Sequence, residues 1–153
     1  MAGPLLSSAL GWLLWSLLVG GLANRLPADW LAGRGDGGPW LGWESLPLYE
    51  QRLAIRRWKP WLPDAGHALP GGVRKAGLAR RDPAPLRRLL LETRRAELVH
   101  WGLWPFWIVT ALWLPPAGVC INLVFASAFN LPCVLVQRYN RLRLVRTLGH
   151  WRG

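Results

Sequence analysis

The sequence predicts an all-α integral membrane protein with about three transmembrane helices and an amphipathic helix at the interface. The 153 residues are 52% hydrophobic and include 12 Trp, yet their net charge is +11, which is unusual for a soluble domain of this length. All Asp, Glu, Lys and Arg side chains lie in 25–97 or 138–152, so 1–24 and 98–137 carry no charge. Since a span needs about 20 apolar residues, the first block has room for one span and the second for two. We expect 1–153 to form a single membrane domain.

The first uncharged block predicts a helix over about 4–23. A secretory signal peptide would also place an apolar stretch at the amino terminus. This block lacks the basic start of a signal peptide, and its apolar part is longer than a typical signal core. We therefore interpret it as a retained transmembrane helix.

The second uncharged block divides at LPPAG, residues 114–118, because paired prolines and a glycine are typical of a tight turn. The predicted spans on either side are 98–114 and 119–137. Pro105 and Pro132 lie within them, and each removes one backbone hydrogen bond and interrupts its helix.

The basic residues predict the orientation of these spans. Segment 25–97 holds 14 Lys or Arg residues and the tail 138–153 holds five, whereas the other parts of the chain hold none. Basic residues near a membrane stay in the cytoplasm. We expect a multi-pass protein of the cell membrane with the amino terminus and the 115–118 turn outside, and with segment 25–97 and the carboxy terminus cytoplasmic.

The cytoplasmic segment begins with a stretch rich in Gly, Pro and Trp, 26–43, which predicts irregular chain at the interface. Apolar side chains then recur at roughly helical spacing: Leu46, Tyr49, Leu53 and Trp58. Basic side chains lie between and beside them: Arg52, Arg56, Arg57 and Lys59. This pattern predicts a short amphipathic helix on the inner leaflet. The basic residues could attach it to anionic lipid, at about 1 kcal/mol each, or bind the phosphates of an activated acyl donor, and composition alone favours the first interpretation.

A further helix is predicted from Asp82 and Pro83 into the membrane, because Asp caps free amides and Pro suits the first helical position. Glu92 lies four residues after Arg88 and three before Arg95. This spacing is typical of ion pairing on a hydrated helix face.

Glu97 and His100 lie on a different face of that predicted helix, together with Leu86, Leu90 and Thr93. That face should turn inward, and three interpretations stay open for the pair. It could be a structural pair at the interface, with Glu97 also within reach of Arg94. His100 could be a general base whose tautomer and charged form Glu97 supports. Metal binding is disfavoured because di-iron bundles use two Glu-x-x-His copies, and His67 and Asp64 form no second spaced cluster; we expect no metal.

Polar and small side chains form a stripe along the third predicted span: Asn122, Ala126, Asn130, Cys133 and Gln137, extended by Arg141. Polar groups inside a membrane are costly unless they face a partner or a cavity. We therefore predict that the stripe faces His100 and Glu97. It could form a functional pocket or hold the helices together through its amides.

Four blocks of sequence are similar to a known family: WE with YE at 43–50, IRRWK with LPDAGH at 55–67, ETRRAELVHW at 92–101 and NLPCVLVQRYNRLRL at 130–144. They occur in the family's order, and the last two are the more specific. The chain resembles the glycosyl-4,4'-diaponeurosporenoate acyltransferase family, membrane enzymes that place a fatty acyl chain on the sugar of a glycosylated carotenoid carboxylate.

The resemblance implies the transfer of an acyl ester to a sugar hydroxyl. For this reaction we predict His100 as the base and Glu97 as the residue that orients it. Candidate donors to the developing oxyanion are Asn130, Tyr139 and Arg141. Candidate ligands for the donor's phosphates are Arg56, Arg57, Lys59 and Arg138. The remaining predicted substrate-binding residues are Gln137, Asn140, Glu92 and Arg95.

The expected partners follow from this reaction. They are membrane lipids, an activated acyl donor such as acyl-CoA that acts as a substrate, and a glycosylated carotenoid or related glycolipid acceptor. We expect no cofactor and no nucleic-acid partner, and we expect self-association or a membrane complex. The alternative function is that of a non-catalytic accessory subunit that binds lipid or pigment, with Trp side chains anchoring it at both interfaces.

Overall fold

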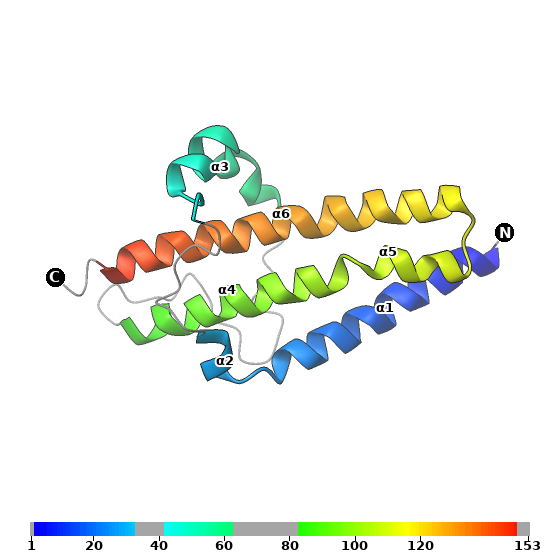
Figure 1. Ribbon diagram of the computed structural model, residues 1–153, viewed down its shortest axis with the longest axis horizontal. Helices are drawn as coiled ribbons and strands as arrows, with labels where there is room; N and C mark the ends of the chain where they lie inside the picture. Colours follow the sequence, from blue (N-terminus) through cyan, green and yellow to red (C-terminus); the bar gives the residue numbers. More distant parts are fainter. Residues whose placement is uncertain (1, 33–41, 63–82, 150–153) are drawn as a thin grey trace. The chain divides into compact units, whose positions relative to one another are not determined.

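The computed structural model describes residues 2–32, 42–62 and 83–149, and all regular structure within these ranges is helical (Figure 1). The all-α class is therefore confirmed. The elements are α1 (Ala2–Asn24), α2 (Ala28–Ala32), η1 (Leu48–Arg52), α3 (Ile55–Trp58), η2 (Lys59–Trp61), α4 (Pro83–Leu103), α5 (Phe106–Val109), η5 (Thr110–Leu112) and α6 (Pro116–Gly149). The chain divides into two compact units: unit 1 is Met1–Leu26 with Arg95–Leu135, and unit 2 is Pro27–Arg94 with Val136–Gly153.

Two of the described helices, α1 and α6, are long and apolar enough to cross a membrane, which suggests a membrane protein. Helix α1 matches the span predicted over 4–23. Its leucines are exposed, as in Leu5 at 74% and Leu14 at 65%, so this surface suits contact with hydrocarbon rather than water.

The second predicted span, 98–114, is not a single helix. Helix α4 ends at Leu103, the chain turns at Trp104 and Pro105, and α5 and the 3-10 turn η5 follow. Pro105 has no N–H to continue the α4 hydrogen-bond ladder, so the break lies where the sequence predicted an interruption.

The third predicted span is longer than 119–137. Helix α6 begins at Pro116, contains Pro132 and continues through the basic end to Gly149, 34 residues in all. The prediction that Pro132 interrupts this helix is wrong, because the loss of one backbone hydrogen bond is tolerated within a long ladder. At 1.5 Å per residue α6 is about 51 Å long, which exceeds the thickness of a bilayer's hydrocarbon core, about 30 Å.

The predicted amphipathic helix over 46–58 is replaced by three short helical turns, η1, α3 and η2. Ala54 separates the first two with φ of 46°, a left-handed conformation that a right-handed helix cannot include. Helix α2 lies within the stretch 26–43 that was predicted to be irregular, and residues 33–41 of that stretch are outside the described residues.

Unit 1 is held together by aromatic and glycine contacts between helices. Phe106 is 3% exposed and packs edge-on against Trp12 of α1, with ring centroids 4.8 Å apart. Indole N–H groups donate at four places: Trp12 to Asn122 Oδ1 (2.9 Å), Trp15 to the Gly102 carbonyl (2.9 Å), Trp104 to Ser127 Oγ (3.1 Å) and Trp113 to Ser8 Oγ (3.0 Å). These tryptophans join helices.

Unit 2 places the short elements against the ends of the long helices. Ile55 of α3 and Leu31 of α2 are buried at 0% and 2% exposure. The Arg94 guanidinium donates to the carbonyls of Leu31 and Ala32. These carbonyls end α2 and have no partner within it, so Arg94 caps the helix.

Candidate functional site

His100 and Asn130 meet in unit 1, where α4 and α6 bring their side chains together. His100 Nδ1 lies 3.0 Å from Asn130 Oδ1. Asn130 is 5% exposed and Ala126, one turn earlier on the same face, is fully buried. At Asn130, the predicted polar stripe of α6 therefore faces His100.

Glu97 lies one helical turn before His100 on α4 and is 3% exposed, so the predicted inward face of this helix is buried at Glu97. The hydrogen-bond partner of His100 Nδ1 is the amide oxygen of Asn130 and not the Glu97 carboxylate. The Glu97 carboxylate thus lies one turn from the His100 imidazole along the helix, while the Asn130 amide is hydrogen-bonded to Nδ1.

The rest of the stripe has other partners. Asn122 Oδ1 accepts a hydrogen bond from the Trp12 indole N–H, so the amino-terminal end of the stripe faces α1. Gln137 and Cys133 are half-buried, and Arg141 is 1% exposed in unit 2.

The two ring nitrogens of His100 differ in their hydrogen bonding. Nδ1 bonds to Asn130, and Nε2 makes no hydrogen bond within the described part of the chain. A neutral imidazole held in this way can accept a proton at the second nitrogen, which is the requirement for a general base.

A second group of polar residues, which we call the tyrosine–glutamate network, lies in unit 2. Glu44 Oε1 accepts hydrogen bonds from the Tyr49 hydroxyl at 2.9 Å and from Arg138 Nη1 at 3.0 Å. The Glu44 side chain is 1% exposed and that of Arg138 is 14% exposed. Two donors thus compensate a buried carboxylate, which otherwise loses its hydration on burial.

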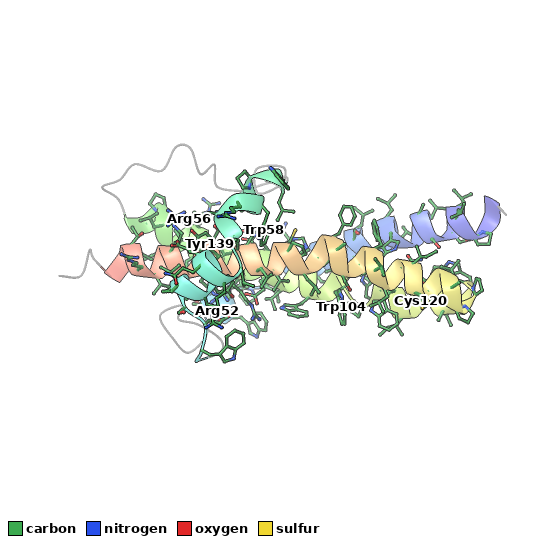
Figure 2. All side chains as sticks on the ribbon, turned by 90° about the horizontal axis from the view of Figure 1, so that it is seen from above. Arg52, Arg56, Trp58, Trp104, Cys120 and Tyr139 are labelled. Atoms are coloured by element: carbon green, nitrogen blue, oxygen red, sulfur yellow. The ribbon has the colours of Figure 1, made fainter. Side chains whose placement is uncertain are left out.

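The ring centroid of Tyr49 lies 6.2 Å from that of Tyr139 on α6, around which a further set of hydrogen bonds in this network is centred; Figure 2 labels Tyr139 and Arg56. The Tyr139 hydroxyl donates to Glu50 Oε1 at 2.9 Å and accepts from Arg56 Nε at 3.3 Å, while Arg56 Nη2 pairs with Glu50 at 2.7 Å. Hydrogen bonding from Tyr139 and the nearby Arg56 charge lower the pKa of the Glu50 carboxyl below its ordinary value. Tyr139 is thus buried, at 1% exposure, between an acid and a base.

Cations also lie over the ring of Tyr139. Lys59 Nζ is 5.3 Å and the Arg143 guanidinium 5.7 Å from the ring centroid, within the range of cation–π attraction. Lys59 Nζ also donates to Asn140 Oδ1 at 2.6 Å.

The remaining predicted residues are placed as follows. Arg57 of α3 is exposed and Glu92 of α4 is half-buried. Arg95 Nη2 lies 3.5 Å from the Leu26 carbonyl. His67 and Asp64 lie outside the described residues, and among the described ones no group of three His, Cys, Asp or Glu is placed to hold a metal ion.

The sequence assigned no site role to Glu44, Tyr49 or Glu50, although the structure bonds Glu44 and Glu50 to α6 and bonds Tyr49 to Glu44. The available signal was the WE and YE blocks of the family resemblance. Their partners on α6 are about 90 residues further along the chain, 94 for Glu44 and 89 for Glu50, so local spacing could not identify them.

Comparison with known proteins places the chain in a family. The sequence model of the glycosyl-4,4'-diaponeurosporenoate acyltransferase family matches residues 27–150. A protein of that name from Staphylococcus haemolyticus (strain JCSC1435) is 36% identical over 104 residues, 67% of this chain and 60% of its own length, so the chain spans less than two thirds of that relative. A protein of the same name from Staphylococcus aureus (strain USA300) is 28% identical over 145 residues, which are 90% of this chain and 83% of that protein's length.

No solved structure matches the chain. The names of the family and of the relatives indicate an acyltransferase. The chain therefore belongs to the glycosyl-4,4'-diaponeurosporenoate acyltransferase family.

Proposed function

We propose that this protein esterifies a fatty acyl group onto a sugar hydroxyl of a glycosylated carotenoid or a related glycolipid at the membrane. The family match and the names of the relatives support this reaction class. Two apolar helices support a membrane setting. The observation that carries the proposal is the partly buried His100–Asn130 hydrogen bond, which leaves Nε2 available as a base.

In the proposed mechanism, His100 Nε2 accepts the proton of the sugar hydroxyl while the sugar oxygen attacks the acyl carbonyl. The resulting tetrahedral oxyanion collapses to the new ester and expels the donor's thiolate, when the donor is a thioester such as acyl-CoA. The imidazolium returns its proton to that thiolate. Glu97, buried one turn away, stabilises the imidazolium by its negative charge.

We also propose the oxyanion donors that the sequence suggests: Asn130, Tyr139 and Arg141. Asn130 uses one of its two amide hydrogens toward the Ala126 carbonyl and retains the other. Tyr139 has a single hydroxyl hydrogen, which it donates to Glu50, so this bond must break before Tyr139 serves an oxyanion.

The basic residues are proposed ligands for phosphates of the acyl donor: Arg56, Arg57, Lys59 and Arg138. Arg57 is exposed, and Arg56 is 67% exposed at its side chain despite its pair with Glu50. These two are the most accessible of the set. Glu92, Arg95, Gln137 and Asn140 are proposed to complete substrate binding.

The proposed membrane arrangement keeps the orientation that basic residues predict. Helix α1, the segment from 98 to 114 and the apolar part of α6 span the membrane, with the amino terminus and the 115–118 turn outside. The basic segment and the carboxy terminus are cytoplasmic, and copies of the chain self-associate.

The test is acyl transfer by a His100→Ala variant. Membranes containing wild-type or variant protein receive an acyl-CoA and a glycosylated carotenoid, and mass spectrometry measures the added acyl chain. We expect the rate of acyl transfer to fall by about 10²–10⁴-fold, the usual contribution of a general base. Unchanged turnover in folded variant protein would contradict the assignment, and no acylation by the wild type on any glycosylated acceptor would contradict the function.

A further inference from the structure

The side-chain amide of Asn130 is fixed in one orientation. Its Nδ2 donates to the Ala126 carbonyl, four residues earlier, at 2.9 Å, and its Oδ1 faces His100 Nδ1 at 3.0 Å. The reverse orientation would place Oδ1 against the Ala126 carbonyl oxygen, so two acceptors would face each other without a hydrogen. The backbone of α6 therefore directs the amide oxygen of Asn130 toward His100.

Asn122, two turns earlier on α6, shows the same arrangement with a different partner. Its Nδ2 donates to the Gly118 carbonyl at 3.1 Å, again four residues earlier, and its Oδ1 accepts the Trp12 indole N–H at 2.9 Å. An indole nitrogen can only donate, so at Asn122 the partner must face an oxygen. Both asparagines use a helix carbonyl to orient an acceptor toward a neighbouring helix.

A histidine nitrogen that faces an amide oxygen must carry the hydrogen. We propose that Asn130 is a positioning residue that holds neutral His100 with its proton on Nδ1, and so keeps the lone pair of Nε2 available. The inference rests on the proposed function only for its effect on acyl transfer, since the position of the proton is a property of the protein alone.

Two residues therefore support His100, each in a different protonation state. The sequence predicted Glu97 as the residue that sets the tautomer, but Nδ1 is occupied by Asn130. Glu97 acts in our proposal on the charged form that arises once Nε2 has accepted a proton. Asn130 acts earlier in the reaction, on the neutral imidazole that must accept the proton.

The first experiment measures the tautomer directly. Protein labelled with ¹⁵N-histidine in detergent micelles is studied by NMR at a pH where the ring is neutral, and the His100 signals are assigned by their loss in His100→Ala. We expect Nδ1 protonated and Nε2 unprotonated in the wild type. Asn130→Ala should shift the ring toward a mixture of tautomers, whereas the matched Asn122→Ala should leave it unchanged. A proton on Nε2 in the wild type, or no change in Asn130→Ala, overturns the inference.

The second experiment follows acyl transfer in the same variants. Asn130→Ala should lower kcat by about 10–100-fold with little change in KM, less than the whole contribution of a general base. Asn130→Asp keeps an oxygen that can accept the Nδ1 hydrogen but replaces the amide hydrogens, one of which donates to the Ala126 carbonyl, with a second acceptor, so it should retain part of the tautomer preference and recover only part of kcat. A variant in which His100 no longer keeps its proton on Nδ1 but kcat is unchanged would contradict the proposed effect of Asn130 on acyl transfer.

The two failures can be told apart. If His100→Ala retains turnover while the NMR shows the Nδ1 proton and its dependence on Asn130, the base assignment fails and the positioning inference stands. If His100→Ala abolishes turnover and Asn130→Ala leaves the tautomer unchanged, the positioning inference fails and the function stands.

Discussion

Tyr139 links an acid and a base through one hydroxyl group. It donates to Glu50 and accepts from Arg56, and its own side chain is buried. Glu50 and Arg56 also pair directly at 2.7 Å, but the Arg56 side chain is largely exposed. Solvent weakens such an exposed pair, so Tyr139 is the residue that most affects the ionisation of Glu50.

Tyr139→Phe should therefore change how stability depends on pH. A Glu whose pKa is lowered by folding stabilises the folded state above its unfolded pKa, about 4.5, and this stabilisation disappears as the pH falls through the folded pKa. The variant loses the largest cause of the shift, so its Tm should lie below that of the wild type at pH 7, and the difference should narrow below about pH 4.5. Thermal unfolding of the wild type and the variant in detergent micelles measures the Tm difference at each pH. A Tm difference that stays constant from pH 7 to below pH 4.5 would contradict the link to Glu50.

Helical spacing predicted some residue contacts and missed others. It correctly predicted that Glu97 is buried and that Asn130 faces His100, because both follow from the 3.6-residue period of two long helices. It could not predict that Glu44 bonds to Arg138. The two residues lie 94 positions apart in the sequence, and helical periodicity relates only residues within one helix.

Gly102 allows close contact between α4 and α1. A Cβ built at this glycine would lie 2.8 Å from Val19 Cγ1, closer than real carbon contacts, and the Gly102 carbonyl accepts the Trp15 indole. Val is stiff at χ1 in a helix and cannot easily rotate away. The absence of a side chain at position 102 thus sets the separation of these helices two residues after His100.

Gly102→Ala should destabilise unit 1 by about 1–3 kcal/mol, the usual cost of overpacking. The double variant Gly102→Ala/Val19→Ala should recover most of that loss, because the shorter side chain removes the clash. Gly20→Ala on α1 is the matched control, since a Cβ there meets no atom within 4 Å. Thermal unfolding in micelles compares the four proteins, and equal effects at Gly102 and Gly20 would contradict the contact.

Element boundaries depend on features that periodicity does not report. The apolar spacing from Leu46 to Trp58 is nearly helical, but Ala54 takes a left-handed conformation that the sequence does not signal, because Ala rarely adopts it. Pro132 shows the opposite case. The proline predicted a break, but α6 continues through Pro132 to Gly149.

At the scale of the whole molecule, composition predicted the helical class and the apolar helices α1 and α6. It also predicted a third span over 98–114. That segment is broken after Leu103, and its second part, α5 and η5, buries Phe106 and Thr110 at 3% and 0% exposure. Uncharged sequence alone cannot distinguish a straight helix from a broken one.

The proposed orientation can be tested at the two ends of α6. In a variant whose free cysteines Cys120 and Cys133 are replaced by Ser, single cysteines are introduced as Ala117→Cys or Gly149→Cys, both at exposed positions. A membrane-impermeant maleimide added to intact cells should label the first and should label the second only after the membrane is disrupted. The reverse pattern would contradict the positive-inside orientation.

The four indole hydrogen bonds of unit 1 affect how the protein should be handled. Water competes for a hydrogen bond between an indole and an amide or hydroxyl, whereas hydrocarbon offers no competing partner. Detergents with short chains admit water among the helices and so weaken the bonds that join α1 to α4 and α6. Extraction in long-chain detergents or in lipid nanodiscs should therefore preserve the position of His100 better than harsher solubilisation.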